Sequence, residues 1–364
     1  MARWPSLMVV GLAAASWAAG LPQADPHDLG LDVQKLAAAR DYALQGGGSG
    51  KVVVQGKDVF RWGDQDQRYD IKSASKSIGV MALGLALADG RAALSDRAVQ
   101  FDPAFGTPPE TNRDGPWRER ITLFHLATQT AGFEKPGGYT KLLFTPGTQW
   151  NYSDGGPNWL ADCLTRLYKR DLQELLFERV FSPIGIERSD LQWRPNAYRP
   201  RELEGVPRRE FGAGVHANVE ALARIGLLYL HKGRWDERQI LPASFVEQAT
   251  RTPDAIRGLP VMHPDQYANA SDHYGLLWWN NSDATLPEVP RDAFWAWGLY
   301  DSLILVVPSL DVVAARTGQR GVSWKRRPQA HPYEVLRGFF VPLVEAVPAV
   351  KTRAGDRRTS APSR

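Results

Sequence analysis

The sequence predicts an α+β fold in which both ends of the chain build one sheet domain and the middle forms an inserted helical domain. Three observations predict it: a β-hairpin pattern near the N-terminus, helical patterns through the middle, and short β-type runs separated by turn residues in the last third. We therefore expect the sheet domain at residues 31–70 together with 265–347, and the helical domain at residues 71–264.

The N-terminal elements are the most sharply patterned. Apolar residues at helical spacing predict a helix over Leu31–Leu44, which the glycine-rich break at Gly46–Gly50 ends. Lys51–Trp62 alternates and turns near Gly56, which predicts a hairpin. Ser75–Ala88 is apolar nearly all round, and this is typical of a helix buried in a large core.

The remaining elements follow the same two periodicities. Helices are expected at Ile121–Thr128, Pro157–Tyr168, Leu172–Phe181, Val219–Lys232, Ser244–Thr250 and Val335–Val347. Strands are expected at Tyr274–Trp279, Ala293–Trp297, Ser302–Val307 and Val312–Arg316.

Composition narrows the functional classes. The 364 residues are 43% hydrophobic and 23% charged, which excludes wholesale disorder, collagen and coiled coil. The net charge of +4 is concentrated in the last fourteen residues, so no basic face is expected and nucleic acid is not a predicted partner. Cys163 is the single cysteine, and no histidines follow a zinc-binding pattern, so neither a disulfide framework nor a metal is predicted.

The first twenty residues, 1–20, resemble a secretory signal peptide. Arg3 supplies the positive start, and the apolar run Leu7–Ala19 is too short to span a bilayer as a mature helix. A buried N-terminal helix is the alternative. We expect a periplasmic or secreted protein without stable membrane insertion after signal cleavage, and a disordered basic tail at residues 348–364.

One motif has the spacing of a nucleophile and its base. Ser73-Ala74-Ser75-Lys76 is the S-x-x-K motif of the chain and opens the predicted buried helix. Residues at i and i+3 share a helix face, so the hydroxyl of Ser73 and the amine of Lys76 are expected to point into the same space. Burial favours a neutral amine that can accept the serine proton. Alternatively, Ser73 is a simple helix cap and Lys76 is solvated.

A second candidate is Tyr152, which lies in the loop Phe144–Gly156. Pro146-Gly147 and Gly155-Gly156 are turn formers on either side of it, so the tyrosine is held on a short loop. A phenol beside a lysine loses its proton more easily, because the ammonium stabilises the phenolate. A tyrosine of the core or rim is the alternative.

These segments together resemble the serine β-lactamase-like hydrolases: class C β-lactamases, D,D-peptidases and related family VIII-type esterases. The resemblance covers about residues 31–347 and rests on the S-x-x-K motif, the Tyr152 loop and three further segments, Ile121–Gly132, Gly226–Trp235 and Trp297–Gly318. It implies a fold like that of β-lactamases and penicillin-binding proteins, with an antiparallel sheet flanked by helices.

The resemblance also implies roles. Ser73 would be the acyl-accepting nucleophile, and Lys76 and Tyr152 would share general-base and general-acid work. The backbone N–H groups of Ser73 and Leu299 would form the oxyanion hole. Substrate-binding positions would be Asp154, Trp297 and Gly298. No cofactor or metal is expected.

Two positions depart from the family pattern. Asp154 stands where the family has asparagine, so it offers only acceptors and adds negative charge beside Lys76. Ala296-Trp297-Gly298 stands where the family has K-T-G or H-x-G, so a cation for a substrate carboxylate is missing there, and Arg316 is a candidate replacement. A literal Y-x-N triplet occurs at Tyr267-Ala268-Asn269, but it lies outside the Pro-Gly loop, so we interpret it as coincidence. Four tryptophans could line an apolar acyl pocket or belong to the core: Trp278, Trp279, Trp295 and Trp297.

The leading hypothesis is an exported serine hydrolase that cleaves a small-molecule ester or amide, or a peptide, through an acyl-enzyme on Ser73. The departures favour an esterase or amidase. A D,D-peptidase or β-lactamase acting on cell-wall peptides or β-lactams is the second hypothesis. A non-catalytic binding or sensor protein on the same fold is the third.

Overall fold

The computed structural model describes residues 20–322 and 331–348. The predicted signal peptide, apart from Gly20, and the predicted basic tail, apart from Pro348, lie outside these residues. Within the described ranges, no helix is long and apolar enough to cross a membrane.

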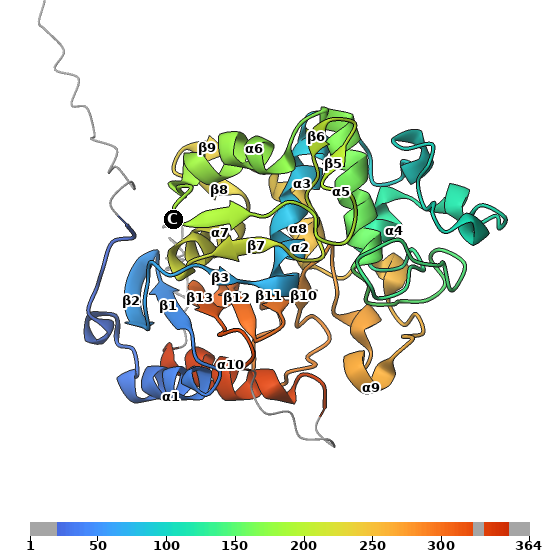
Figure 1. Ribbon diagram of the computed structural model, residues 1–364. Helices are drawn as coiled ribbons and strands as arrows, with labels where there is room; N and C mark the ends of the chain where they lie inside the picture. The colour runs from blue at the N-terminus through green and yellow to red at the C-terminus, as the bar shows by residue number, and fades with distance from the viewer. Residues whose placement is uncertain (1–19, 323–330, 349–364) are drawn as a thin grey trace, which may run out of the picture.

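A six-stranded antiparallel sheet forms the centre of the molecule, in the order β10-β11-β12-β13-β1-β2 (Figure 1). Its strands are β1 (Ser49–Val54), β2 (Lys57–Trp62), β10 (Trp279–Asn280), β11 (Phe294–Gly298), β12 (Ser302–Val307) and β13 (Val312–Thr317). The N-terminal hairpin joins the C-terminal strands where Ser49 of β1 lies opposite Thr317 of β13. The prediction of one sheet built from both ends of the chain is therefore confirmed.

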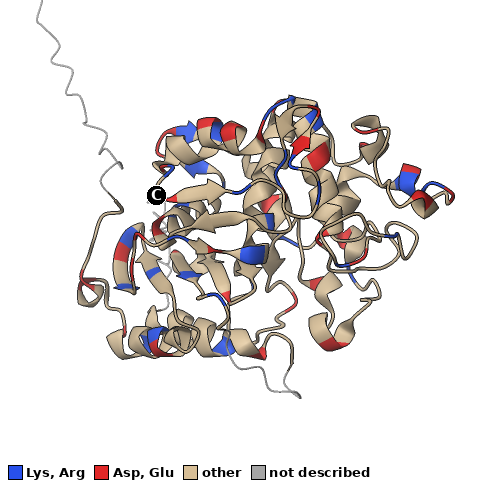
Figure 2. Ribbon diagram, viewed as in Figure 1, with Lys and Arg blue, Asp and Glu red and all other residues tan. Residues whose placement is uncertain are grey.

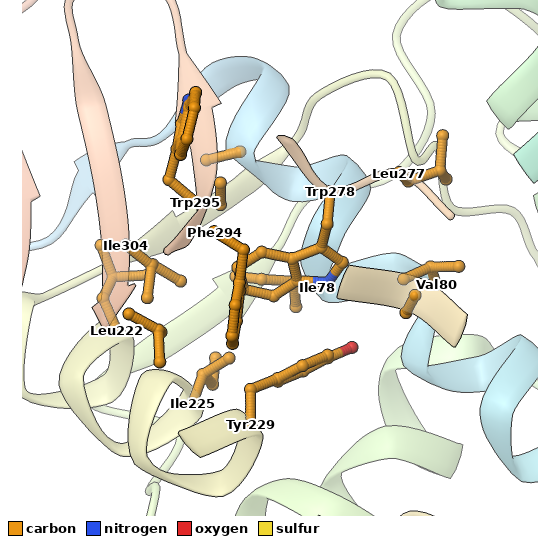
Figure 3. Packing of buried hydrophobic residues seen from close by; sticks show 14 of the residues in the cluster. Ile78, Val80, Leu222, Ile225, Tyr229, Leu277, Trp278, Phe294, Trp295 and Ile304 are labelled. Carbon is orange, nitrogen blue, oxygen red and sulfur yellow. The ribbon is translucent and has the colours of Figure 1, made fainter. Parts of the chain in front are cut away.

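Helices cover both faces of this sheet (Figure 1). On one face α1 (Val33–Leu44) packs against α10 (Glu334–Ala346), and the hydroxyl of Tyr42 donates to the carbonyl of Val335 at 2.8 Å. On the other face lies α7 (Val219–Leu230). Its apolar side chains meet those of β11 and β12 in the core (Figure 3).

The stretch between β2 and β10 supplies the helices and small sheets beside the central sheet (Figure 1). The helices are α2 (Ser75–Gly79), α3 (Met81–Ala88), α4 (Leu123–Ala127), α5 (Gly155–Tyr168), α6 (Leu172–Leu176), α8 (Ala243–Thr250) and α9 (Pro264–Tyr267). A three-stranded sheet has the order β3 (Tyr69–Asp70), β7 (Val215–Ala217), β4 (Leu191–Trp193). Two hairpins complete the set: β5 (Glu202–Leu203) with β6 (Val206–Pro207), and β8 (Arg234–Trp235) with β9 (Arg238–Gln239).

A buried ion cluster holds this region together. Asp162 on α5 accepts from Arg199 at 2.6 Å and from Arg208 at 2.5 Å, and all three side chains are almost completely buried. Because an uncompensated buried charge is costly, the two arginines fix their loops to α5. Elsewhere in the view of Figure 2, basic and acidic residues are interspersed.

Three sequence predictions differ from the structure. The single helix expected over Ser75–Ala88 is divided into α2 and α3. The strand expected over Tyr274–Trp279 is wrong, because Leu277 takes a φ of +59° and the chain folds back so that Tyr274 bridges Trp279. Helix α7 falls in the range predicted as helical domain, but it packs on the central sheet.

Candidate active site

Ser73 lies on a short 3-10 turn, Lys72–Ala74, that leads into α2. The backbone N–H of Ile71 donates to the carbonyl of Val215 at 3.1 Å, and the hydroxyl of Ser75 accepts from the N–H of Val215 at 3.1 Å. Strand β7 therefore holds the segment on both sides of Ser73. The serine itself is half-buried, so it remains reachable from solvent.

The residue before Ser73 has an unusual backbone conformation. Lys72 takes a φ of +53°, which is uncommon for a residue with a Cβ. Asp70 compensates, since one of its oxygens accepts from the backbone N–H of Lys72 at 3.1 Å and the other from its ammonium at 2.5 Å. The sharp turn thereby directs the chain so that Ser73 and Lys76 share one side of the helix start.

Lys76 is almost completely buried, and it is directed at Ser73. Its Nζ donates to Ser73 Oγ at 3.1 Å, to the carbonyl of Gly212 at 3.1 Å, and to Asp154 Oδ1. An ammonium has three N–H donors, so these three acceptors satisfy it completely. Asn158 on α5 positions the Gly212 peptide by accepting its N–H at 2.8 Å.

Tyr152 is buried in an aromatic cluster next to the lysine. Its ring stacks on Tyr267 at 5.2 Å and on Trp279 at 5.7 Å between centroids. Lys76 Nζ lies 4.8 Å from the centroid of the Tyr152 ring. Burial raises the pKa of Tyr152 to about 12, and the nearby charge of Lys135 and a hydrogen bond with Ser73 only partly oppose this rise. At neutral pH the resting phenol is therefore protonated.

Asp154 begins α5 and binds two lysines at once. Lys76 takes Oδ1, and Lys135 Nζ donates to Oδ2 at 2.5 Å. Burial alone would raise the pKa of Asp154, but the charges and hydrogen bonds of Lys76 and Lys135 outweigh it and hold the pKa below its ordinary value. Because both oxygens accept from lysines, the carboxylate is already engaged at the position where the family pattern places a substrate-binding amide.

The predicted third element borders Ser73 from β11. Gly298 packs so closely that an added Cβ would lie 1.9 Å from the carbonyl oxygen of Ile71. Leu299 follows Gly298 at an exposed turn. The indole N–H of Trp297 donates to Asp301 at 3.3 Å. The cation of the family pattern would stand at position 296, where this strand has a buried alanine, and Trp297 adds an indole at the next position.

Arg316, the candidate replacement cation, is fully buried on β13. Its guanidinium donates to the carbonyls of Tyr300 and Asp301 at 2.6 and 2.5 Å, and to the carbonyls of Ala43 and Gly47 at 3.0 and 3.1 Å. Burial lowers its pKa to about 10. Arg316 therefore links the turn after Gly298 to the end of α1 through hydrogen bonds to backbone carbonyls of both.

The four tryptophans divide between core and site. Trp278 and Trp295 are fully buried, and Figure 3 shows Trp278 packed among Tyr229, Phe294 and Ile78 in the core. Trp279 stacks on Tyr152, and Trp297 lies 6.2 Å from Trp279 between ring centroids. Only the second pair adjoins the cluster around Ser73.

Three participants were missed or misjudged from the sequence. Lys135 and the carbonyl of Gly212 lie in irregular loops and give no motif. Tyr267 belongs to the Y-x-N triplet interpreted as coincidence, yet its ring stacks on Tyr152. The asparagine of that triplet, Asn269, donates instead to Asp272 and Asp283. No group of three His, Cys, Asp or Glu side chains suited to a metal ion occurs in the described ranges.

The antiparallel sheet, the flanking helices and the clustered hydroxyl, amine and phenol define the class of serine β-lactamase and penicillin-binding-protein-like hydrolases. The chain belongs to the Beta-lactamase family, whose sequence profile matches residues 35–337.

Solved structures agree on the fold. A putative β-lactamase from Bacteroides dorei is 17% identical, with a TM-score of 0.67 and coverage of 87% of this chain and 99% of that one. A β-lactamase/D-alanine carboxypeptidase from Yersinia pestis is also 17% identical, with a TM-score of 0.60 and coverage of 86% and 97%. EstCE1, a hydrolase with promiscuous acyltransferase activity, is 14% identical, with a TM-score of 0.64 and coverage of 86% and 99%. At these identities the likeness is one of fold.

Proposed function

We propose that this protein is an exported serine hydrolase that cleaves an ester or amide through an acyl-enzyme on Ser73. The observation that carries the proposal is the contact between Lys76 Nζ and Ser73 Oγ at 3.1 Å beside the phenol of Tyr152. A half-buried hydroxyl, a buried amine and a buried phenol in one cluster provide a nucleophile and two groups that can move its proton.

The chemistry proceeds in two halves. Ser73 Oγ attacks the substrate carbonyl and passes its proton to Lys76 or Tyr152, once that pair has released a proton. The oxyanion is held by the backbone N–H groups of Ser73 and Leu299, and the leaving group departs with the proton. Water then attacks the acyl ester, the same pair accepts a proton from the water, and the pair passes that proton to Ser73 Oγ as the acid is released.

The geometry favours an esterase or amidase over a β-lactamase. Ala296 stands at the strand position where the family pattern has lysine or histidine, so that position supplies no cation for a substrate carboxylate, and Asp154 places a charged group where a neutral amide would bind substrate. The hydrolase EstCE1 shows that this fold accommodates acyl-transfer chemistry. The substrate would be a small-molecule ester or amide with an apolar acyl group.

A fluorophosphonate probe tests the proposal. We expect it to label the wild type and Ser309→Ala, whose serine lies at the other end of β12, and to spare Ser73→Ala. Equal labelling of Ser73→Ala, or none of the wild type, would refute the acyl-enzyme. A panel of p-nitrophenyl esters run beside nitrocefin and a D-alanyl peptide then assigns the substrate class, and turnover of the last two would favour the peptidase or β-lactamase alternative. Stable acylation without turnover would favour a sensor.

The proposal of export rests on residues 1–20 of the sequence. Fractionation of cells that express the full chain tests it. A shortened protein in the periplasm or medium is the expected result, and a full-length cytoplasmic protein would contradict it.

A further inference from the structure

The position of Lys135 gives it a part in the site that no sequence motif indicates. It lies on the loop after α4, and its Nζ donates to Asp154 Oδ2 at 2.5 Å while Lys76 occupies Oδ1. Its Nζ also lies 5.0 Å from the ring centroid of Tyr152, close to the 4.8 Å of Lys76. Two ammonium groups thus share one carboxylate and face one phenol.

The charges of this group decide how readily it releases a proton. With Lys76 and Lys135 protonated and Asp154 ionised, the three side chains carry a net charge of +1. Without Lys135 they would carry zero, and Asp154 would act on Lys76 alone. A like charge within about 4–6 Å favours loss of a proton from its neighbour, whereas an opposite charge favours retention.

We propose that Lys135 is a positioning residue: it binds the outer oxygen of Asp154, offsets the charge of that carboxylate, and so leaves Lys76 able to exchange a proton with Ser73. The inference rests on the proposed function, because it concerns how the same nucleophile is activated. It also explains how an aspartate is compatible with a base at this position.

The titratable groups around Asp154 and Tyr152 come from several elements. Lys76 comes from α2, Asp154 and Tyr152 from the start of α5 and its preceding loop, and Lys135 from the loop after α4. Other titratable groups that act electrostatically on Asp154 or Tyr152 are Glu210, Tyr198, Tyr274 and Tyr333. Among the described residues, the cations that hydrogen-bond to Asp154 are Lys76 and Lys135.

The test is the pH dependence of fluorophosphonate labelling of the full chain. In Lys135→Met the acidic limb of the labelling profile should move up by about one pH unit, because the cluster around Asp154 has then lost one positive charge and releases its proton less readily. In Asp154→Asn the limb should move down by a similar amount, because the carboxylate that favours the proton is gone. Lys135→Arg, which keeps the charge, should restore the wild-type limb.

These outcomes separate positioning from mere support. If Lys135→Met lowers the labelling rate at every pH without moving the limb, Lys135 is only structural and the proposal is overturned. Thermal unfolding of each variant checks that it is folded. If the wild type shows no Ser73-dependent labelling at any pH, the proposed function is refuted, and this inference with it. If Ser73 is labelled but the pH profile of Lys135→Met is unchanged, only the inference about Lys135 is refuted.

Discussion

Gly298 is the position where one methyl group should do the most damage to the proposed site. It lies on β11, directly against the segment that carries Ser73. An added Cβ would lie 1.9 Å from the backbone oxygen of Ile71 and 3.0 Å from the backbone nitrogen of Ala74. Neither atom belongs to a flexible side chain, so Gly298→Ala must move one backbone away from the other.

The size of that movement follows from the contact. Ordinary van der Waals contact begins at 3.4 Å, so the strand and the nucleophile turn must separate by about 1.5 Å. A misplacement of about 1 Å at a reacting group can cost about 100-fold in rate. We expect Gly298→Ala to lower the second-order rate of fluorophosphonate labelling at Ser73 by about 100-fold or more, and stability by about 1–3 kcal/mol.

Gly226→Ala provides the matched control. Its Cβ would lie 2.5 Å from a methyl group of Val313 in the core between α7 and the sheet, so it should also destabilise by overpacking. It should leave the labelling rate near that of the wild type, because it touches no part of the site. Labelling kinetics and thermal unfolding are measured on both variants. A Gly298→Ala protein that loses stability like the control but labels at the wild-type rate would refute the argument.

Three further predictions concern buried polar groups. Tyr152→Phe should lower the rate of ester hydrolysis about 100-fold or more. Because the pKa of Tyr152 is about 12 in the folded protein against 10.0 in the unfolded chain, the neutral phenol contributes about 3 kcal/mol to the free energy of unfolding below pH 10, and this contribution is lost as the pH rises to 12. In urea unfolding, the stability of the variant should therefore fall less than that of the wild type between pH 10 and 12. Arg316→Met leaves buried carbonyls unpaired and should lower the free energy of unfolding by about 3 kcal/mol, with slower labelling at Ser73. Asp162→Ala removes the carboxylate shared by two buried guanidinium groups and should lower the free energy of unfolding in chemical denaturation by about 4 kcal/mol.

The fold was predictable from sequence where local pattern and tertiary environment agree. The hairpin at residues 51–62 and the strands over 302–307 and 312–316 were located closely, because their alternation or apolar runs match buried strands. Tyr274–Trp279 failed because an aromatic-rich run also suits a tight turn packed into a core. The divided helix at residues 75–88 failed because hydrophobicity all round gives no information on where a helix bends.

At the site, the S-x-x-K motif and the loop of Tyr152 pointed to residues that the structure brings together: Lys76 hydrogen-bonds Ser73 and faces the ring of Tyr152. Their catalytic roles, and that of Leu299, stay predictions. Lys135 could not be found because it lies in an irregular loop, 19 residues from its partner Asp154, and belongs to no motif. The use of Arg316 could not be inferred either, since a buried arginine that binds carbonyls and one that binds a ligand look alike in sequence.

The pairing of β1 with β13 has a consequence for biogenesis. The partners Ser49 and Thr317 are 268 positions apart, so nearly the whole polypeptide must be synthesised before the first hairpin finds its neighbour. An isolated two-stranded hairpin is marginal in water, and its apolar Val52–Val54 edge would meanwhile be open to wrong partners. Pairing between strands so far apart in sequence slows folding, and until β13 has been synthesised the unpaired edge of the hairpin must be protected from aggregation.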